Sequence, residues 1–156
     1  EGFQNSQVDT VLKRLHEVAS IREKELNEDT LIYNANMTEM KPEVGHQLPI
    51  EMYREGYEYY VETHFHPNSH SCFVQRNLMD LMVYDPVQFM YLLDQPLLMM
   101  VGDHADTNYM SEQAFELAIT TKEKELYYLK DATHIQTYYK ESVVKEAIEK
   151  LDIFYK

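Results

Sequence analysis

The chain has 156 residues, the size of one ordinary domain, and its apolar fraction of 44% is typical of a globular protein. Acidic residues outnumber basic residues by 27 to 14, and no basic run or basic helix face stands out. This balance argues against nucleic acid or an anionic membrane surface as the main partner. The single cysteine, Cys72, cannot form an internal disulfide.

The N-terminus carries no export signal, and no apolar run approaches the roughly 18 residues that a membrane-spanning helix needs. We therefore expect a cytoplasmic protein without a membrane partner. Because the chain opens with Glu1 rather than Met, we also expect a processed product or a fragment of a longer protein.

The first part of the chain, residues 1–94, is predicted to be mostly helical. Apolar residues at three- and four-residue steps predict an amphipathic helix over 7–26, with Ser6 or Asp9 as its N-cap. Residues 30–35 suit either a strand or an extended segment. Residues 36–48 contain a proline and a glycine without a clear period, so we expect a loop.

A second helix is expected from Pro49 to about residue 62, because proline suits a first helical turn. Its tyrosines are expected to pack in the core, with an aromatic pocket as the alternative; they are Tyr53, Tyr57, Tyr59 and Tyr60. Residues 63–72 are predicted to be loop and 73–84 helical. A further helical segment is expected to begin at Pro86, with Asp85 as its N-cap.

The second part, residues 95–156, is predicted to alternate strands and helices. Strands are expected near 96–101 and 125–129, and helices over 111–120 and 139–155. The first strand is a continuous apolar run that ends at a glycine, which predicts burial on both faces. This order predicts two parallel strands joined by a right-handed crossover. We expect both parts to form one structural unit.

Ionisable side chains follow both predicted strands. Asp103, His104 and Asp106 come directly after the first strand, and His134 follows the second. Ligands of open α/β sheets gather outside the carboxyl ends of the strands, and adjacent strands lie about 4.8 Å apart. A carboxylate that held one ring nitrogen of His134 would fix its tautomer and leave the other nitrogen free as a base. The spacing therefore allows half of a nucleophilic constellation, with an unrelated pair of solvated loop side chains as the alternative.

Two stretches, "PLLMMVGDHADTNYMSEQAFELA" and "KELYYLKDATHIQTYYKESVVKEAIEKLDIFY", resemble the C-terminal end of an α/β-hydrolase. The nearest branch is that of the bacterial, dienelactone-hydrolase-like esterases and peptidases. In this family the catalytic acid follows the seventh strand in a glycine–x–x–(x)–Asp turn, and the catalytic histidine follows the eighth strand. The resemblance implies that Asp106 is the acid and His134 the histidine. Asp103 competes for the acid role, although its place directly after Gly102 favours a turn or capping group; we expect His104 to be solvated.

The resemblance extends upstream to "PIEMYREGYEYYVETHFHPNS" and "LMDLMVYDPVQFMYLL". These stretches resemble the helical region that this branch places between its sixth and seventh strands, where it partly covers the active-site mouth. The expected fold is therefore the C-terminal part of an α/β-hydrolase, an α/β structure with a small parallel sheet, flanking helices and a helical cap-like region.

The family's nucleophile, which lies in a G-x-S-x-G elbow, is absent. The chain has four glycines, at positions 2, 45, 56 and 102, and none belongs to such a motif. Neither Ser69 nor Cys72 is expected to substitute, because no strained elbow or activating group surrounds them. We therefore expect this chain to supply part of a Ser-His-Asp site for an ester, thioester or amide, without a cofactor, and to be inactive alone.

Two alternatives remain open. Half of an α/β-hydrolase leaves an open strand edge, so the chain is expected to bind its missing N-terminal half or to form a homodimer, and it could be a non-catalytic remnant or interaction module. The second alternative is a zinc site in the spacing H-x-H-x3-H-x-C, with the ligands His64, His66, His70 and Cys72. The resemblance favours a plain loop there.

Overall fold

The structure, a computed structural model, describes residues 8–156, so the candidate cap Ser6 lies outside the described residues. The helices are α1 (Val8–Glu28), α2 (Pro42–Gly45), α3 (Glu51–Tyr57), α4 (Leu78–Val83), α5 (Asn108–Leu117) and α6 (Glu141–Phe154), and the strands are β1 (Leu97–Gly102) and β2 (Lys124–Leu129). Shorter helical turns lie between them: η2 (Met37–Glu39), η3 (Glu58–Thr63), η4 (Gln75–Asn77), η5 (Pro86–Leu92) and η6 (Ile135–Tyr138). Among these helices, none combines the length and apolar composition needed to cross a membrane.

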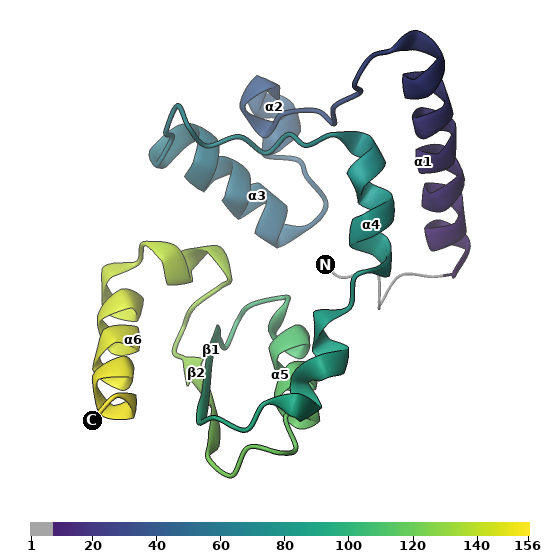
Figure 1. Ribbon diagram of the computed structural model, residues 1–156. Helices are drawn as coiled ribbons and strands as arrows, with labels where there is room; N and C mark the ends of the chain where they lie inside the picture. Colours follow the sequence, from purple (N-terminus) through teal and green to yellow (C-terminus); the bar gives the residue numbers. More distant parts are fainter. Residues whose placement is uncertain (1–7) are drawn as a thin grey trace.

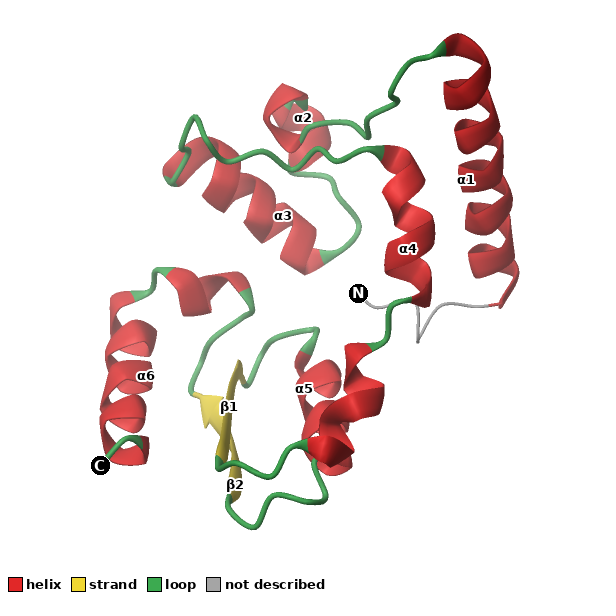
Figure 2. Ribbon diagram, viewed as in Figure 1, coloured by secondary structure: helices red, strands yellow, loops and turns green. Residues whose placement is uncertain are grey.

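The two strands and their helices form a mixed α/β unit beside a helical region (Figures 1 and 2). The helical region consists of α1 to α4, and Figure 2 shows no strand drawn there. The two parts contact each other where η5 packs on α5 and where α3 packs on η6. The expected division between residues 94 and 95 stays a prediction.

The long helix α1 matches the predicted amphipathic helix and is fixed to the rest of the helical region by a buried carboxylate. Val18 is only 2% exposed, and α1 runs beside α4 (Figure 1). Glu25 is also buried and accepts a 2.8 Å hydrogen bond from the backbone N–H of Ile32. The guanidinium of Arg76 lies 3.5 Å from the same carboxylate. Glu25 therefore joins α1 to the extended segment that follows it and to η4.

The segment 30–35, for which the sequence left strand or extended backbone open, forms a single antiparallel bridge. Tyr33 pairs with Val74, which lies just before η4. Flanking this bridge, the backbone N–H of Gln75 donates to the carbonyl of Ile32 at 2.8 Å. The segment is thus extended backbone with one bridge rather than a strand.

The predicted loop over 36–48 contains two short helical turns, so that prediction is partly wrong. Asn36 begins η2 by accepting a 3.3 Å hydrogen bond from the N–H of Thr38, and Pro42 is at the first turn of α2. The next helix starts at Glu51 instead of Pro49, because Ile50 is still extended (φ −104, ψ 128). Of the two turns, η2 has a side-chain cap and α2 begins with a proline, but at three and four residues both are too short to show a hydrophobic period.

Tyr57 is the most enclosed aromatic side chain of the helical region, with 1% exposure. Its ring lies against Gly45, where an added Cβ would come within 2.6 Å of the ring atoms. Its hydroxyl donates to the carbonyl of Met40 at 3.3 Å. This side chain therefore packs α3 onto α2, as expected for the core account, whereas Tyr53 and Tyr60 are exposed.

The strands β1 and β2 are parallel, as the order of elements predicted. Their register runs from Leu97 opposite Lys124 to Gly102 opposite Leu129. Figure 1 shows α5 and α6 on opposite sides of the strand pair, the arrangement that parallel strands joined by crossover helices adopt. Helix α5 begins at Asn108, three residues before the predicted start, and ends at Leu117.

The core of this unit lies between the sheet and α6. It contains Leu129, Ala132 and Val143, with Met100 and Tyr127 packed against them. The apolar surface of β1 is nevertheless incompletely covered.

The prediction that β1 is buried on both faces is wrong for its first four residues, 97–100, which are only half-buried. The sheet of the described residues has two strands, and no third strand pairs with the free edge of β1. The chain exposes 10999 Å² of surface, whereas a compact monomer of its 18.6 kDa mass exposes about 8,200 Å². A strand with the composition of an inner strand is therefore an edge strand here.

Gly102 ends β1 at a place where a side chain has no room. A Cβ there would lie 2.2 Å from the backbone oxygen of Ala132. Because backbone cannot move aside as a flexible side chain can, only glycine allows the loop after β1 to approach the turn after β2.

We predict that Gly102→Ala lowers the free energy of unfolding by about 1–3 kcal/mol, because the added methyl group forces these two segments apart. Gly56→Ala is the matched control, since a Cβ there meets only the Ile135 side chain at an ordinary 3.8 Å. In helix α3 this control change should be neutral or slightly stabilising. Urea unfolding followed by circular dichroism measures both, and equal stability of the two variants would contradict the prediction.

Candidate functional site

The segments that leave β1 and β2 stay hydrogen-bonded to each other beyond the ends of the strands. The N–H of Asp103 donates to the carbonyl of Leu129 at 3.0 Å, and the N–H of His104 donates to the carbonyl of Ala132 at 3.0 Å. Together with the glycine contact, these bonds hold the two exit loops side by side at the carboxyl end of the sheet. This is the edge at which open α/β sheets bind ligands.

Asp103 uses its carboxylate to fix the turn after β2. One oxygen accepts a 3.1 Å hydrogen bond from the backbone N–H of Ala132. That hydrogen bond is the main reason why the pKa of Asp103 is below its usual range. Partial burial opposes the shift, while the backbone of Asp131 and the nearby His104 add to it. Asp103 therefore acts as a clamp between the exit loops.

His134 is half-buried and is held at both ring nitrogens by hydroxyl groups. Its Nδ1 lies 3.1 Å from Oγ1 of Thr107, in the loop that follows β1. Its Nε2 lies 2.6 Å from the hydroxyl oxygen of Tyr138. The exit loops thus meet at the imidazole, as the strand order predicted, but through a threonine hydroxyl.

Thr107 occupies the N-cap position of α5 without capping it. The side chain is 8% exposed and makes no hydrogen bond to the first turn of the helix. A threonine cap stabilises a helix by about 1 kcal/mol, and here the hydroxyl faces His134 instead. This contact was missed from the sequence, because the helix was expected to begin only at residue 111 and a loop threonine carries no signal of its partner.

Asp106, the predicted acid, directly precedes Thr107 and is exposed. The side chain that the structure brings against the Nδ1 of His134 is that of Thr107, one residue further along the loop. The acid and the histidine predicted from the sequence are therefore on adjoining loops without a direct hydrogen bond between them. Among the described residues, Asp106 is the carboxylate nearest in sequence to the group that binds the imidazole.

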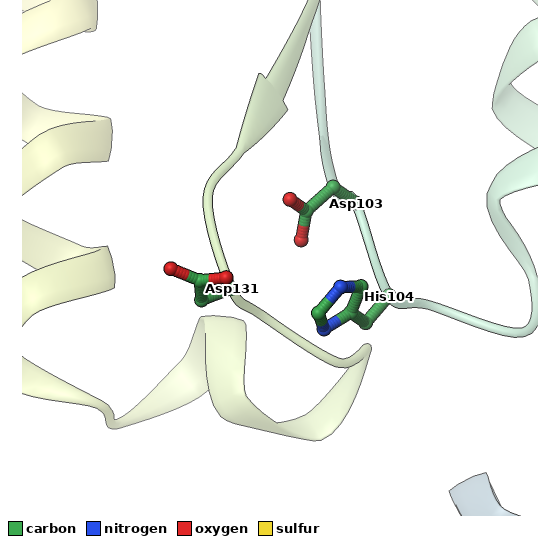
Figure 3. Close-up of side chains that lie close together, drawn as sticks. All are labelled: Asp103, His104 and Asp131. Atoms are coloured by element: carbon green, nitrogen blue, oxygen red, sulfur yellow. The ribbon is translucent and has the colours of Figure 1, made fainter.

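A second set of ionisable groups lies at the same end of the sheet. Asp103, His104 and Asp131 place their ligand atoms within 4.8 Å of one another, and Figure 3 shows the three side chains gathered between the exit loops. Asp131 has a left-handed backbone conformation, with φ 51. His104, expected to be solvated, is exposed but has two carboxylates beside it. This cluster is built around the Asp103 clamp and does not include His134.

The four candidate zinc ligands do not come together. Among the described residues, no group of three or more potential metal ligands includes any of them. The Nδ1 of His66 accepts a 3.1 Å hydrogen bond from the N–H of Asn68, and the ring of His64 stacks on Tyr59 with centroids 4.5 Å apart. His70 lies 3.5 Å from the side chain of Asn36. The loop directs these side chains to different neighbours.

Rings from η3, η6 and the residue after each form a contiguous group, called here the aromatic cluster: Tyr59, Tyr60, His64, Tyr138 and Tyr139. Tyr59 is its centre, stacked on Tyr139 at 5.3 Å and edge-on to Tyr138 at 5.8 Å. Burial, and to a lesser degree Tyr60, raises the pKa of Tyr138. The cluster therefore links the helical region to the residue that binds His134.

Tyr60 also lines a cavity of about 390 Å³. Its lining residues are Met37, Thr38, Tyr60, Asn68, Ser69, His70 and Ser71. Asn36 organises this polar wall, accepting a hydrogen bond from the Ser71 hydroxyl at 3.1 Å. Tyr60 thus matches the pocket alternative, whereas Tyr57 matches the expected core packing.

The fold resembles that of a solved structure over nearly all of this chain. The crystal structure of the hypothetical protein PA2218 from Pseudomonas aeruginosa superposes with a TM-score of 0.74 at 20% sequence identity, covering 96% of this chain. The chain spans 46% of that protein, less than half of its length. At this identity the likeness shows the fold alone. No protein-family model and no curated protein matches the chain.

Asp103→Asn is predicted to lower the free energy of unfolding at pH 7, because the amide oxygen accepts the Ala132 hydrogen bond less strongly than a carboxylate. The pKa of Asp103 is depressed in the folded state, so its stabilising effect is complete above the usual carboxyl pKa of about 3.9 and is lost as pH falls through the lower folded value. The gap between wild type and variant should therefore shrink from pH 7 to pH 3.

Urea midpoints at both pH values measure this gap, and Asp152→Asn on the exposed end of α6 serves as the control. A gap that stays constant with pH would contradict the clamp role of the ionised carboxylate.

Proposed function

We propose that this chain is the C-terminal portion of a serine hydrolase of the α/β-hydrolase superfamily, acting on an ester, thioester or amide in the cytoplasm. The chain supplies the acid and the histidine of a Ser-His-Asp site, and the serine comes from a polypeptide segment outside it. The observation that carries the proposal is the meeting of the two exit loops at the imidazole of His134, 3.1 Å from Thr107.

In this proposal His134 is the general base. Its Nδ1 faces the loop after β1, where a carboxylate would orient the ring and stabilise its protonated form. Its Nε2 would take the proton of the serine hydroxyl and then pass it to the leaving group. This chemistry requires no cofactor.

We assign the acid role to Asp106 rather than to Asp103. The carboxylate of Asp103 is already bound to the backbone of Ala132 and is needed to hold the exit loops together. Asp106 is exposed in the same loop and adjoins Thr107, the residue that contacts the imidazole. The assignment requires the loop to rearrange so that the Asp106 carboxylate, rather than the Thr107 hydroxyl, faces Nδ1.

The free edge of β1 leaves room for a further segment that carries the serine. The free edge of β1 and the half-buried residues 97–100 offer a docking surface for further parallel strands. The similar Pseudomonas protein is more than twice as long as the part that this chain matches. We propose that the partner is a segment equivalent to the remainder of such a fold, which adds strands to β1 and carries the nucleophile.

The second candidate is a non-catalytic interaction module that pairs β1 with a second copy of itself. The excess exposed surface of the chain favours this alternative as well, because a homodimer would cover the same edge. The two candidates differ in whether His134 has a catalytic task.

Hydrolysis of a short-chain p-nitrophenyl ester distinguishes them. The 156-residue chain alone should give no turnover above the buffer rate. The coding DNA upstream of Glu1 should contain an in-frame G-x-S-x-G segment, and the polypeptide that includes it should hydrolyse the ester. In that polypeptide His134→Gln and Asp106→Asn should each lower kcat/KM by at least about 10⁴-fold.

The controls are His16→Gln on α1 and Asp152→Asn on α6, two exposed residues remote from the exit loops, which should leave kcat/KM within about twofold. Full activity in His134→Gln would rule out the hydrolase proposal. A larger loss in Asp103→Asn than in Asp106→Asn would transfer the acid role to Asp103. Turnover by the 156-residue chain that disappears in His134→Ala would show that no outside serine is needed.

A further inference from the structure

The hydroxyl of Tyr138 contacts Nε2 of His134. In a Ser-His-Asp triad this ring nitrogen accepts a hydrogen bond from the nucleophile's hydroxyl. The Tyr138 hydroxyl lies 2.6 Å from Nε2 of His134, and the two rings meet edge-on with centroids 5.4 Å apart. His134 is the residue before η6 and Tyr138 is its last residue, so one short helical turn fixes the pair. Thr107 occupies the other nitrogen.

The chemistry of the two hydroxyls indicates which nitrogen carries the proton. A neutral imidazole has one N–H donor and one acceptor nitrogen. The phenol of Tyr138 is more acidic than the alcohol of Thr107, so it is the better hydrogen-bond donor and donates a hydrogen bond to Nε2. The Nδ1–H then donates to the threonine oxygen. This is the tautomer that a Ser-His-Asp base requires, with the Nε2 lone pair directed at a hydroxyl donor.

We propose that Tyr138 is a positioning residue for His134: its hydroxyl takes the place of the nucleophile's hydroxyl at Nε2 and holds the imidazole in the Nδ1–H tautomer. The catalytic meaning of this role rests on the proposed function, whereas the tautomer itself is a property of the chain. A serine hydroxyl that engages Nε2 must displace the tyrosine, because the single lone pair accepts one strong hydrogen bond. Tyr138 is 45% exposed, which leaves it room to move outward.

The aromatic cluster determines where Tyr138 rests. Tyr59, on η3 of the helical region, contacts Tyr138 at 5.8 Å and Tyr139 at 5.3 Å, and α3 lies next to η6 (Figure 1). Through these ring contacts the helical region holds the Tyr138 hydroxyl against His134.

The test is the tautomer of His134, read from long-range proton–nitrogen correlation spectra of the histidine-labelled 156-residue chain at about pH 8.5, well above the usual histidine pKa of about 6.5. In the wild type Nε2 should show the ¹⁵N shift of an unprotonated nitrogen and Nδ1 that of a protonated one. The His134→Gln spectrum assigns the resonances by their loss. In Tyr138→Phe the donor is gone, so the tautomers should mix and the two ¹⁵N shifts should converge.

Tyr139→Phe is the matched control, because Tyr139 belongs to the same cluster and its ring contacts are with Tyr59 and His64. It should leave the shifts of His134 unchanged. A protonated Nε2 in the wild type would overturn the proposal, and this result needs no variant to fold. Unchanged shifts in a folded Tyr138→Phe would also overturn it. Neither measurement uses substrate or serine, so failure here is separate from failure of the hydrolase proposal in the ester assay.

Discussion

The parallel pairing of β1 with β2, continued past the strand ends by Gly102, is the constraint on which the rest of this structure depends. A parallel pair brings two carboxyl ends to the same edge, and the missing side chain of Gly102 lets the loop after β1 contact the backbone of Ala132. The Asp103 carboxylate then clamps the contact by accepting the Ala132 N–H. Without these features the loop that carries Asp106 and the turn that carries His134 would have no fixed relation.

As a result, His134 in the candidate site is already oriented, whereas the edge of β1 is open. His134 is held by Thr107 from the β1 side and by Tyr138 from its own turn, so its orientation does not depend on any group outside the chain. The free edge of β1, in contrast, leaves the sheet incomplete and its apolar residues half-exposed. In the proposed function, a segment that pairs with this edge also carries the nucleophile, so that assembly of the sheet would complete the proposed active site.

The sequence predicted the parts of the fold that periodicity and turn chemistry determine. The apolar run before Gly102 and the alternation of helix and strand after it predicted the parallel strand pair and its flanking helices. They also predicted that His134 lies at the carboxyl end of the sheet. The burial of β1 was overestimated, because apolar composition reports what a complete sheet would cover rather than what this chain covers. The contacts of Thr107 and Tyr138 with His134 could not be predicted, because a hydroxyl side chain has no periodic signature and its partner depends on how the chain folds around it. The zinc spacing failed for a related reason, because spacing within a loop does not fix where side chains point.

The central claim is that β1 is an inner strand left with an open edge, and residue-resolved amide hydrogen exchange tests it most directly. The N–H of Leu97 donates to Glu123, just before β2, and the N–H of Asp103 donates to Leu129 at the end of β2. In a parallel ladder, every second N–H between them points toward β2 in the same way. The alternate amides, those of Leu98, Met100 and Gly102, face the free edge. In the chain alone the first set should be protected and the second should exchange fast. Uniform protection from Leu97 to Gly102 would show that the edge is already covered and would contradict the account.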